Sequence, residues 1–312
     1  MNRNASHSGR SLAAAAAVLV ALLVAQGSAA PAAHAAAGLT RVTAISASSS
    51  NTTRTISAIC PAGQRVFGGG AEIVNGQQRV VLERLQPRHD ATDDRFIAGA
   101  REQATGYDGA WQLRAFAICG APRPGLQIIA GDAPTSSVSP QSLAAACPAG
   151  QREVGFGGRI NNGAGQVRLT DLYDFFGPPS SLLIVGARED ADGYAGNWSL
   201  SSYTICADES ATDGFVLAGT TSPTDSNNKS VVVTCPAGTQ VHTTGALLRA
   251  AGPATTASLV IDRVSVDTPL TSATVRVAEA PGGTTGSWTV IGFALCGPPV
   301  AQPFTPPGAP PG

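Results

Sequence analysis

The chain consists of short apolar runs separated by clusters of Gly, Pro, Ser, Thr, Asn and Asp. Runs of this kind, rich in β-branched and aliphatic residues, are typical of β-strands. The strands that this pattern predicts most clearly in the first copy are 66–74, 79–85 and 95–101. Their counterparts in the second copy are 154–160, 166–172 and 182–188. No stretch of about 10–12 residues has the period of an amphipathic helix. The pattern therefore predicts an all-β protein built from many short strands.

The same pattern occurs three times. Each copy opens with Cys-Pro-Ala-Gly, at Cys60, Cys147 and Cys235, and a second cysteine follows 59, 59 and 61 residues later. A tryptophan precedes each closing cysteine by eight residues, and these are the only three tryptophans. A glycine follows each opening cysteine by ten residues, and an arginine follows it by 41. These shared offsets indicate an internal repeat of about 88 residues with about six strands per copy.

The opening motif predicts a turn that leads into a glycine-rich strand. Proline presets φ and glycine accepts a positive φ, so Pro-Ala-Gly favours a turn. The glycines that follow, such as Gly68, Gly69 and Gly70 in the first copy, predict a β-bulge or a place where another backbone approaches closely.

The strand that carries the tryptophan is predicted to lie inside a sheet. In the first copy, alternation puts Trp111, Leu113 and Cys119 on one face. Phe116 and Ile118 lie on the other face, so the end of the strand is apolar on both sides and is predicted to be covered twice. One cover is its own copy, and the other is formed by neighbouring copies around a pseudo-threefold axis. The alternative is three separate beads, each a closed small sandwich.

The repeat divides the chain into three copies, at 39–120, 126–207 and 215–297. The linkers between them are short, which favours copies that pack together. The predicted fold is all-β, with three tandem antiparallel repeats in a β-sandwich or β-prism-like, pseudo-threefold arrangement and one disulfide in each copy.

The two ends of the chain differ from the repeats. Arg3 and Arg10 precede an apolar run at 12–24, and a small-x-small motif ends at Ala35. This order predicts a secretory signal peptide, residues 1–35, cleaved near Ala35. Its apolar core is too short to span a bilayer, which needs about 20 residues. The mature protein is therefore predicted to be secreted and to have no membrane span, and the proline-rich end, 298–312, is predicted to be a disordered tail.

Charge argues against two classes of partner. Only 13% of the residues are charged, and the net charge of −1 becomes −3 when the signal peptide with its two arginines is removed. A mildly acidic chain without a run of basic residues argues against nucleic acid and anionic membranes as partners.

Six cysteines in a chain predicted to be exported indicate disulfide bonds. The repeat favours one bond within each copy, which gives the pairs Cys60–Cys119, Cys147–Cys206 and Cys235–Cys296. Each bond closes a loop of about 60 residues and contributes roughly 4 kcal/mol in the chain-entropy model. The alternative is a zinc site, but the chain lacks Cys-x-x-Cys, and the mature part holds only His89 and His242, at non-equivalent positions. No metal and no cofactor is predicted.

The sequence contains little that indicates catalysis. It lacks Gly-x-Ser-x-Gly, and the two histidines that a triad would need, His89 and His242, are predicted to be exposed loop or strand residues. Carboxylate pairs, as in glycoside hydrolysis, are the remaining route. The candidates are Asp93, Asp94, Asp171, Asp174, Asp190, Asp192, Asp262 and Asp267. They cluster in predicted turns, where Asp forms local hydrogen bonds, so a structural role is favoured.

The recurring arginines are candidates for binding. Arg101, Arg188 and Arg276 would form an anion-binding ring if the copies close around an axis. Local pairing, or packing of each side chain over an aromatic ring, is the favoured interpretation. The acidic residues suggested as local partners are Glu102, Glu189 and Glu279.

The aromatic residues divide into two groups. The tryptophans share a strand face with Leu and Cys and are therefore predicted to lie in the core. Tyr107 and Tyr194 lie in polar, glycine-rich turns and are predicted to be exposed enough to contact a glycan. The third copy has no tyrosine in this turn, so a site of this kind is not threefold.

The order Cys-Pro-Ala-Gly, glycine-rich strand, Trp and closing Cys resembles a repeat of exported bacterial proteins without an assigned activity, over residues 39–297. In the second copy, Cys147-Pro148-Ala149-Gly150 with Gly155-Phe156 is also similar to the repeat of the vitelline membrane outer layer protein family. That family is a β-prism of three sheets associated with a glycoprotein-rich extracellular coat, so this similarity implies a prism. It covers about a dozen residues per copy, and no functional residue is carried over from it.

These features predict a secreted, non-catalytic β-repeat protein, an extracellular or envelope-associated binding or structural module with a glycan or protein ligand. The alternative is a secreted glycan-active hydrolase that uses carboxylates in the turns of the first and second copies. The predicted binding residues are Tyr107, Tyr194, Arg101, Arg188 and Arg276.

Overall fold

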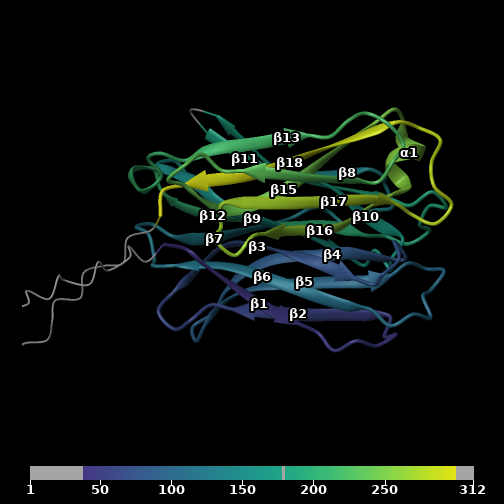
Figure 1. The fold of residues 1–312 in the computed structure, drawn as a ribbon, viewed down its shortest axis with the longest axis horizontal. Coiled ribbons are helices and arrows are strands. Elements are labelled where there is room, and N and C mark those ends of the chain that lie inside the picture. The colour runs from purple at the N-terminus through teal and green to yellow at the C-terminus, as the bar shows by residue number, and fades with distance from the viewer. Residues whose placement is uncertain (1–37, 178–179, 300–312) are drawn as a thin grey trace, which may run out of the picture. The chain divides into compact units, whose positions relative to one another are not determined.

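The computed structural model describes residues 38–177 and 180–299 and is all-β, with six strands from each copy (Figure 1). The strands of the first copy are β1 (Thr40–Ile45), β2 (Thr53–Ile59), β3 (Arg65–Val74), β4 (Val80–His89), β5 (Asp94–Glu102) and β6 (Gln112–Gly120). Those of the second copy are β7 (Gln127–Asp132), β8 (Gln141–Ala146), β9 (Gln151–Asn161), β10 (Val167–Gly177), β11 (Ser180–Glu189) and β12 (Ser199–Asp208). Those of the third copy are β13 (Val216–Thr221), β14 (Lys229–Thr234), β15 (Gln240–Ala250), β16 (Leu259–Val266), β17 (Ser272–Glu279) and β18 (Trp288–Gly297). The predicted signal peptide and the tail from residue 300 onward lie outside the described residues.

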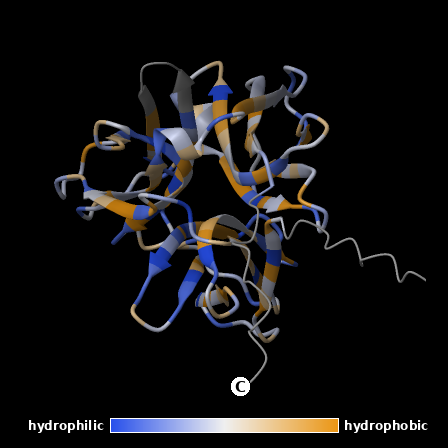
Figure 2. Cartoon of the chain, turned by 90° about the vertical axis from the view of Figure 1, so that its left-hand side faces the viewer, coloured by the Kyte–Doolittle hydropathy of each residue, from blue (hydrophilic) through white to orange (hydrophobic). Residues whose placement is uncertain are grey.

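The strands form three six-stranded antiparallel sheets, and each sheet combines strands from two copies. The first sheet has the order β1-β6-β3-β16-β17-β14, the second sheet β2-β5-β4-β9-β12-β7, and the third sheet β13-β18-β15-β10-β11-β8. In each sheet the third strand of one copy pairs with the fourth strand of another, as β9 does with β4. Figure 2 shows the strands in three groups around a common centre. The copies are therefore interleaved around a pseudo-threefold axis and are not three separate beads.

Within one copy, the six strands divide into two halves that belong to different sheets. In the first copy, β1, β6 and β3 lie in the first sheet, whereas β2, β5 and β4 lie in the second. The two halves pack against each other. Apolar side chains such as Leu82, Phe96, Trp111 and Leu113 fill the space between them. Each copy is thus a small sandwich whose two layers continue into neighbouring copies.

The tryptophans lie in these cores, as predicted, and all three are fully buried. The indole N–H of each donates to a glutamate Oε1 at 3.0 Å, in the pairs Trp111–Glu102, Trp198–Glu189 and Trp288–Glu279. The second carboxylate oxygen accepts a backbone N–H from the turn before the tryptophan. Each buried indole donor is therefore satisfied. The suggestion that these glutamates bind the recurring arginines is wrong for Arg101 and Arg276, which bind Glu83 and Asp262 instead.

The tryptophan-bearing strand is central, as its two apolar faces predicted. β6 lies between β1 and β3, and its last five residues are all buried. Trp111 and Leu113 face the core of the first copy. On the opposite face, the guanidinium of Arg41 lies 4.7 Å from the centre of the Phe116 ring. Ile118 belongs to a second apolar cluster, which contains residues of all three copies.

Three residues at one repeated position close the centre where the copies meet. Phe67, Val154 and His242 each follow their opening cysteine by seven residues, and each is the bulged residue of its strand. All three are fully buried. The His242 ring packs against Phe67 and Phe215, with ring centroids 5.6 and 4.5 Å apart. The prediction that His242 is exposed is therefore wrong, because the bulge turns its side chain inward.

The predicted close approach of two backbones occurs where the copies join. Gly70, Gly157 and Gly245 follow their opening cysteines by ten residues. A Cβ atom at these positions would lie 2.0, 2.2 and 1.9 Å from a carbonyl oxygen of the adjoining copy. Only glycine leaves room for that oxygen, so the repeated glycine is required by the junction.

The disulfides join the three sheets to one another. The pairs are Cys60–Cys119, Cys147–Cys206 and Cys235–Cys296, one within each copy. Each bond links the end of the second strand to the tryptophan-bearing strand, and these strands belong to different sheets. The first bond therefore ties the second sheet to the first, the second bond ties the third to the second, and the third bond ties the first to the third.

The third copy departs from the other two in the connection between its third and fourth strands. A five-residue helix, α1 (Pro253–Ala257), lies there, where the other copies have a tight turn. A short 3-10 helix, η1 (Glu209–Ala211), precedes this copy. Within residues 38–177 and 180–299, no helix has the length and apolar character needed to cross a membrane.

Candidate functional site: an arginine-lined groove

A groove of about 320 Å³ lies on the second sheet, where the first and second copies join. β2, β4 and β5 of the first copy line it, together with β9 and the turn that follows β9. Its charged lining residues are Arg54, Glu83, Arg84, Arg101 and Arg159. Thr53, Thr55 and Asn162 add hydroxyl and amide groups. We call this hollow the arginine groove.

The fold places two arginines opposite each other in this groove. Arg84 of β4 follows a bulge at Glu83 and is in register with Arg159 of β9. Directly opposite residues on antiparallel strands have Cβ atoms about 5 Å apart. Among the described residues, neither guanidinium forms an ion pair with a carboxylate, and Arg84 Nε instead donates to Gln86 Oε1 at 2.6 Å. Two positive charges are therefore held side by side.

The pKa values in the groove follow from burial and from this crowding. Burial lowers the pKa of Arg84, and the charge of Arg159 lowers it further. Burial raises the pKa of Glu83, and the charge of Arg101 opposes that rise. Arg101 Nε lies 3.4 Å from Glu83 Oε2, while Glu83 Oε1 accepts the N–H of Gly165 at 3.1 Å. The one carboxylate of the groove is thus bound to Arg101, and positive charge is left over at Arg84 and Arg159.

Arg54 lines the groove but is already occupied by contacts within the protein. Its guanidinium carbon lies 4.6 Å from the centre of the Trp111 ring. One of its terminal nitrogens donates to the backbone and hydroxyl oxygens of Ser49 at 2.5 Å. Arg54 therefore covers the tryptophan and is not counted among the arginines open to a ligand.

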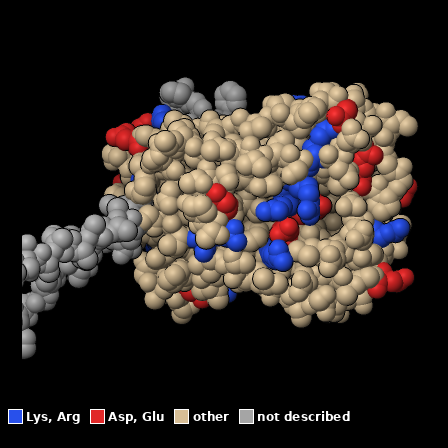
Figure 3. Space-filling view, in the orientation of Figure 1, with Lys and Arg blue, Asp and Glu red and all other residues tan. Residues whose placement is uncertain are grey.

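The first sheet has a counterpart of this groove in which the charges are balanced. The counterpart has a volume of about 260 Å³, and Asp262 and Arg276 line it. Arg276 Nε donates to Asp262 at 2.7 Å. Beside this pair, Glu72 lies 3.2 Å from Arg114 and 3.5 Å from Arg263. Figure 3 shows basic and acidic side chains intermixed over the strands that Figure 1 labels β16 and β17.

The third sheet lacks basic residues at the positions that correspond to the two opposed arginines. Asp171 and Leu247 are paired there, where the second sheet has Arg84 and Arg159. Helix α1 also contacts β11 of this sheet. An opposed, unneutralised arginine pair is therefore a feature of the second sheet and not of the repeat.

The recurring arginines do not form the suggested ring. Arg101 and Arg188 precede their tryptophans by ten residues, whereas Arg276 precedes Trp288 by twelve. Arg276 consequently takes the strand position that Gly99 has in the first copy. Arg101 lines the arginine groove, Arg276 lines its counterpart on the first sheet, and Arg188 lies on β11 of the third sheet. Local pairing is instead present at Arg101 and Arg276.

The two tyrosines predicted to contact a glycan lie against the protein. A Cβ atom at Gly109 would lie 2.3 Å from the Tyr107 ring, and one at Gly196 would lie 2.5 Å from the Tyr194 ring. Both rings are half-buried, and Tyr107 Oη donates to the carbonyl oxygen of Asn75 at 2.8 Å. They are more exposed than the tryptophans, but neither lines the arginine groove.

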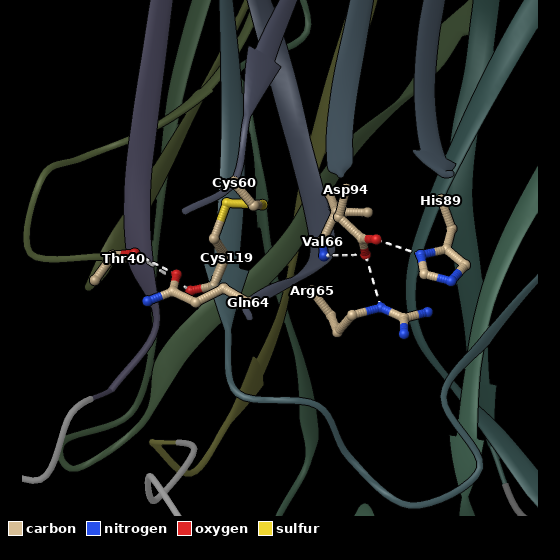
Figure 4. Close-up of a disulfide and its surroundings, with 8 residues drawn as sticks. All are labelled: Thr40, Cys60, Gln64, Arg65, Val66, His89, Asp94 and Cys119. Atoms are coloured by element: carbon tan, nitrogen blue, oxygen red, sulfur yellow. Dashed lines mark hydrogen bonds and ion pairs between the residues drawn. A yellow bond between two sulfur atoms is a disulfide. The ribbon is translucent and has the colours of Figure 1, made fainter. Parts of the chain in front are cut away.

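Several of the carboxylates considered for catalysis are used in local structure. Asp94 accepts hydrogen bonds from Arg65 Nε and the Val66 N–H, both at 2.9 Å, and contacts the exposed His89 (Figure 4). Asp267 binds the backbone N–H groups of residues 271 and 272 in a turn. These contacts agree with the predicted structural role. The predicted placement in turns is wrong for Asp94, Asp171, Asp174 and Asp262, which lie in strands.

Two carboxyl groups of the second copy lie in the interior. Glu153 is fully buried and Asp174 is 1% exposed. Burial raises the pKa of Asp174 to about 7, and burial followed by the charge of Asp174 raises the pKa of Glu153 well above its ordinary value. The first copy has Val66 and Pro87 at these positions. Neither carboxyl lines the arginine groove.

The described residues contain no cluster of three or more His, Cys, Asp or Glu side chains that could hold a metal ion. A scan against protein-family models finds no match to this sequence. A search of curated proteins likewise finds no match. The function of the arginine groove is therefore inferred from the chemistry of the residues that line it.

Sequence reasoning missed Arg84 and Arg159 because it looked for residues that recur in every copy. The two arginines lie in strands of different copies and become neighbours only through the pairing of β4 with β9.

Proposed function

We propose that this protein is an exported, non-catalytic binding module whose arginine groove takes up an anionic group of an extracellular ligand. The observation that carries the proposal is the opposed pair of Arg84 and Arg159. Like charges directly opposite on neighbouring strands destabilise a sheet. A carboxylate or sulfate placed between the two guanidinium groups would accept hydrogen bonds from both and remove the repulsion.

The scaffold around the groove supports a binding role. The groove lies on paired strands of a sheet that two disulfides tie to its neighbours. Side chains on such elements are held in place before a ligand arrives, which reduces the entropy lost on binding. Three disulfides also fit a protein that works in an oxidising, extracellular environment.

The proposal is tested by titrating the mature, oxidised protein with galacturonate, a sugar that carries one carboxylate, and following the titration by NMR. A small ligand held by two half-buried arginines at the surface is expected to bind with a Kd of about 1 mM. The double variant Arg84→Gln/Arg159→Gln should lose this binding. Arg276→Gln, in the balanced counterpart on the first sheet, is the matched control and should retain it. Equal loss in both variants, or no binding to the unchanged protein, would contradict the proposal.

The repulsion between Arg84 and Arg159 should also lower the stability of the ligand-free protein. Arg159→Leu introduces the residue that the third copy has at this position, Leu247. Removing the repulsion is expected to raise the free energy of unfolding by up to about 1 kcal/mol while galacturonate binding is lost. A variant that is less stable and still binds would show that Arg159 has a structural role only.

A further inference from the structure

A second hollow, of about 580 Å³, lies on the second sheet next to the arginine groove. Its lining includes Gln86, Arg88, Gln127, Ile128 and Tyr203. These residues come from β4 of the first copy and from β7 and β12 of the second copy. The hollow therefore spans the same junction between copies as the arginine groove.

β4 connects the two hollows. Side chains two residues apart in a strand point to the same face, so Arg84, Gln86 and Arg88 form one row. Arg84 lines the arginine groove, while Gln86 and Arg88 line the second hollow. The hydrogen bond from Arg84 Nε to Gln86 Oε1, 2.6 Å long, joins their side chains. Arg84 and Arg88 are about 13 Å apart along the strand. We call this row of side chains, with the two hollows that it passes, the track; it is longer than one small anion.

Positive charge exceeds negative charge along this track. Among the described residues that line the two hollows, Glu83 is the one carboxylate. Arg88 Nε binds Asp90 at 2.9 Å at the end of the strand, but its side chain remains 52% exposed. Arg65 also lines the second hollow and pairs with Asp94 at 2.9 Å. The track therefore has Arg84 and Arg159 at one end and the paired arginines Arg88 and Arg65 at the other.

Neutral polar groups and one aromatic ring lie between the arginines. Gln86 and Gln127 present amide groups, Thr55 presents a hydroxyl, and Tyr203, which is 9% exposed, lines the second hollow. Amides and hydroxyls bind the hydroxyl groups of a sugar, and an aromatic ring packs against the apolar face of a sugar ring. Arginine forks suit the carboxylates of the same chain.

We infer that the second sheet binds a linear acidic polysaccharide along β4, with its carboxylates on the arginines and its hydroxyl groups on the residues between them. This inference rests on the proposed function and specifies its ligand. Single-stranded nucleic acid fits the track less well, because such ligands stack successive bases on several aromatic side chains. The lining of the two hollows offers the largely buried ring of Tyr203 and the imidazole of His89, which contacts Asp94. An acidic peptide added as a strand would need a free sheet edge, whereas β4 lies between β5 and β9.

The test is a length series of oligogalacturonates, from the monosaccharide to the hexamer, titrated calorimetrically into the mature, oxidised protein. Affinity is expected to rise at least tenfold from monomer to hexamer, since the longer chain reaches both hollows. Arg88→Gln should lower the affinity for the hexamer about fivefold, the effect of one partly exposed charge pair. Arg276→Gln on the first sheet is the matched control and should leave the whole series unchanged. A neutral glucose hexamer of cellulose type should not bind.

The outcomes separate the two proposals. Binding of the monosaccharide without a gain in affinity for longer chains would overturn the polysaccharide track and leave the anion site intact. Absence of binding for every member of the series would overturn both. Tighter binding of oligothymidylate or of a polyglutamate peptide than of the hexamer would overturn the assignment to a polysaccharide.

Discussion

Replacing His242 with valine, the residue of the second copy at this position, is expected to remove an acid-induced loss of stability. Burial, and then the charge of Arg123, lowers the pKa of His242 from its ordinary value of 6.5 to about 3 in the folded protein. Between these values the unfolded chain binds a proton that the folded chain does not bind. The free energy of unfolding therefore falls as the pH is lowered from about 6.5 toward 3, and no further below that. At pH 5 the loss is roughly 2 kcal/mol.

The assay is guanidinium unfolding of the oxidised protein at pH 7 and pH 5, followed by the fluorescence of the three buried tryptophans. The quantity to compare is the change in free energy of unfolding between the two pH values. His242→Val should show a change about 2 kcal/mol smaller than that of the unchanged protein. The loss of packing volume in this variant affects both pH values equally, so it cancels in the comparison.

Phe67→Val is the matched control, because Phe67 occupies the equivalent position in the first copy and contacts the His242 ring. It should lower stability by a similar amount at both pH values. If His242→Val retained the full pH dependence of the unchanged protein, the buried imidazole would not be the group responsible. An imidazole NMR signal of His242 that titrates near pH 6.5 in the folded protein would refute the reasoning directly.

Three further predictions concern the core and the junctions. The carboxyl of Asp174 stays protonated up to about pH 7 when folded but ionises near its ordinary value of 3.8 when unfolded, so stability falls as the pH rises through this window. Asp174→Asn should remove that fall, about 3 kcal/mol between pH 4.5 and pH 8, in unfolding curves measured at these two pH values. Gly157→Ala places a Cβ atom 2.2 Å from a carbonyl oxygen and should cost about 1–3 kcal/mol, whereas Gly252→Ala, which meets nothing within 4 Å, should change the melting temperature little. The double change Cys147→Ala/Cys206→Ala should lower the free energy of unfolding by about 4 kcal/mol, and an unchanged melting temperature would exclude a stabilising role for this bond.

Features that each copy repeats could be predicted from the sequence. The cysteine pairs, the buried tryptophans and the glycine at the close approach recur at fixed offsets, so their shared role follows from local spacing. Two predictions, for His242 and Arg276, were wrong because the copies depart locally from that spacing. A one-residue bulge reverses the face of His242. The third copy has two more residues between its opening cysteine and its tryptophan, so Arg276 is shifted by two strand positions although its distance from the opening cysteine matches that of Arg101.

The candidate site could not be predicted in the same way, because it depends on which strand pairs with which. The local pattern of β4 gives its length and its two faces but does not specify that β9 of the next copy is its partner. The opposition of Arg84 and Arg159 exists only through that pairing. The opposed arginine pair of the candidate site is therefore formed at positions whose residues differ between the copies.

The interleaving of the sheets has a consequence for how such a chain can be divided or assembled. A single copy cut from this protein would turn its third and fourth strands into sheet edges, because each keeps its partner within the copy but loses its partner from the neighbouring copy. The backbone groups along one side of each strand would then be unpaired. Three such copies on separate chains could make the same pairings with one another, each donating half a sheet to its neighbour. The covalent linkers then serve mainly to raise the effective concentration of the copies for one another. The present fold is the single-chain equivalent of a strand-exchanged trimer.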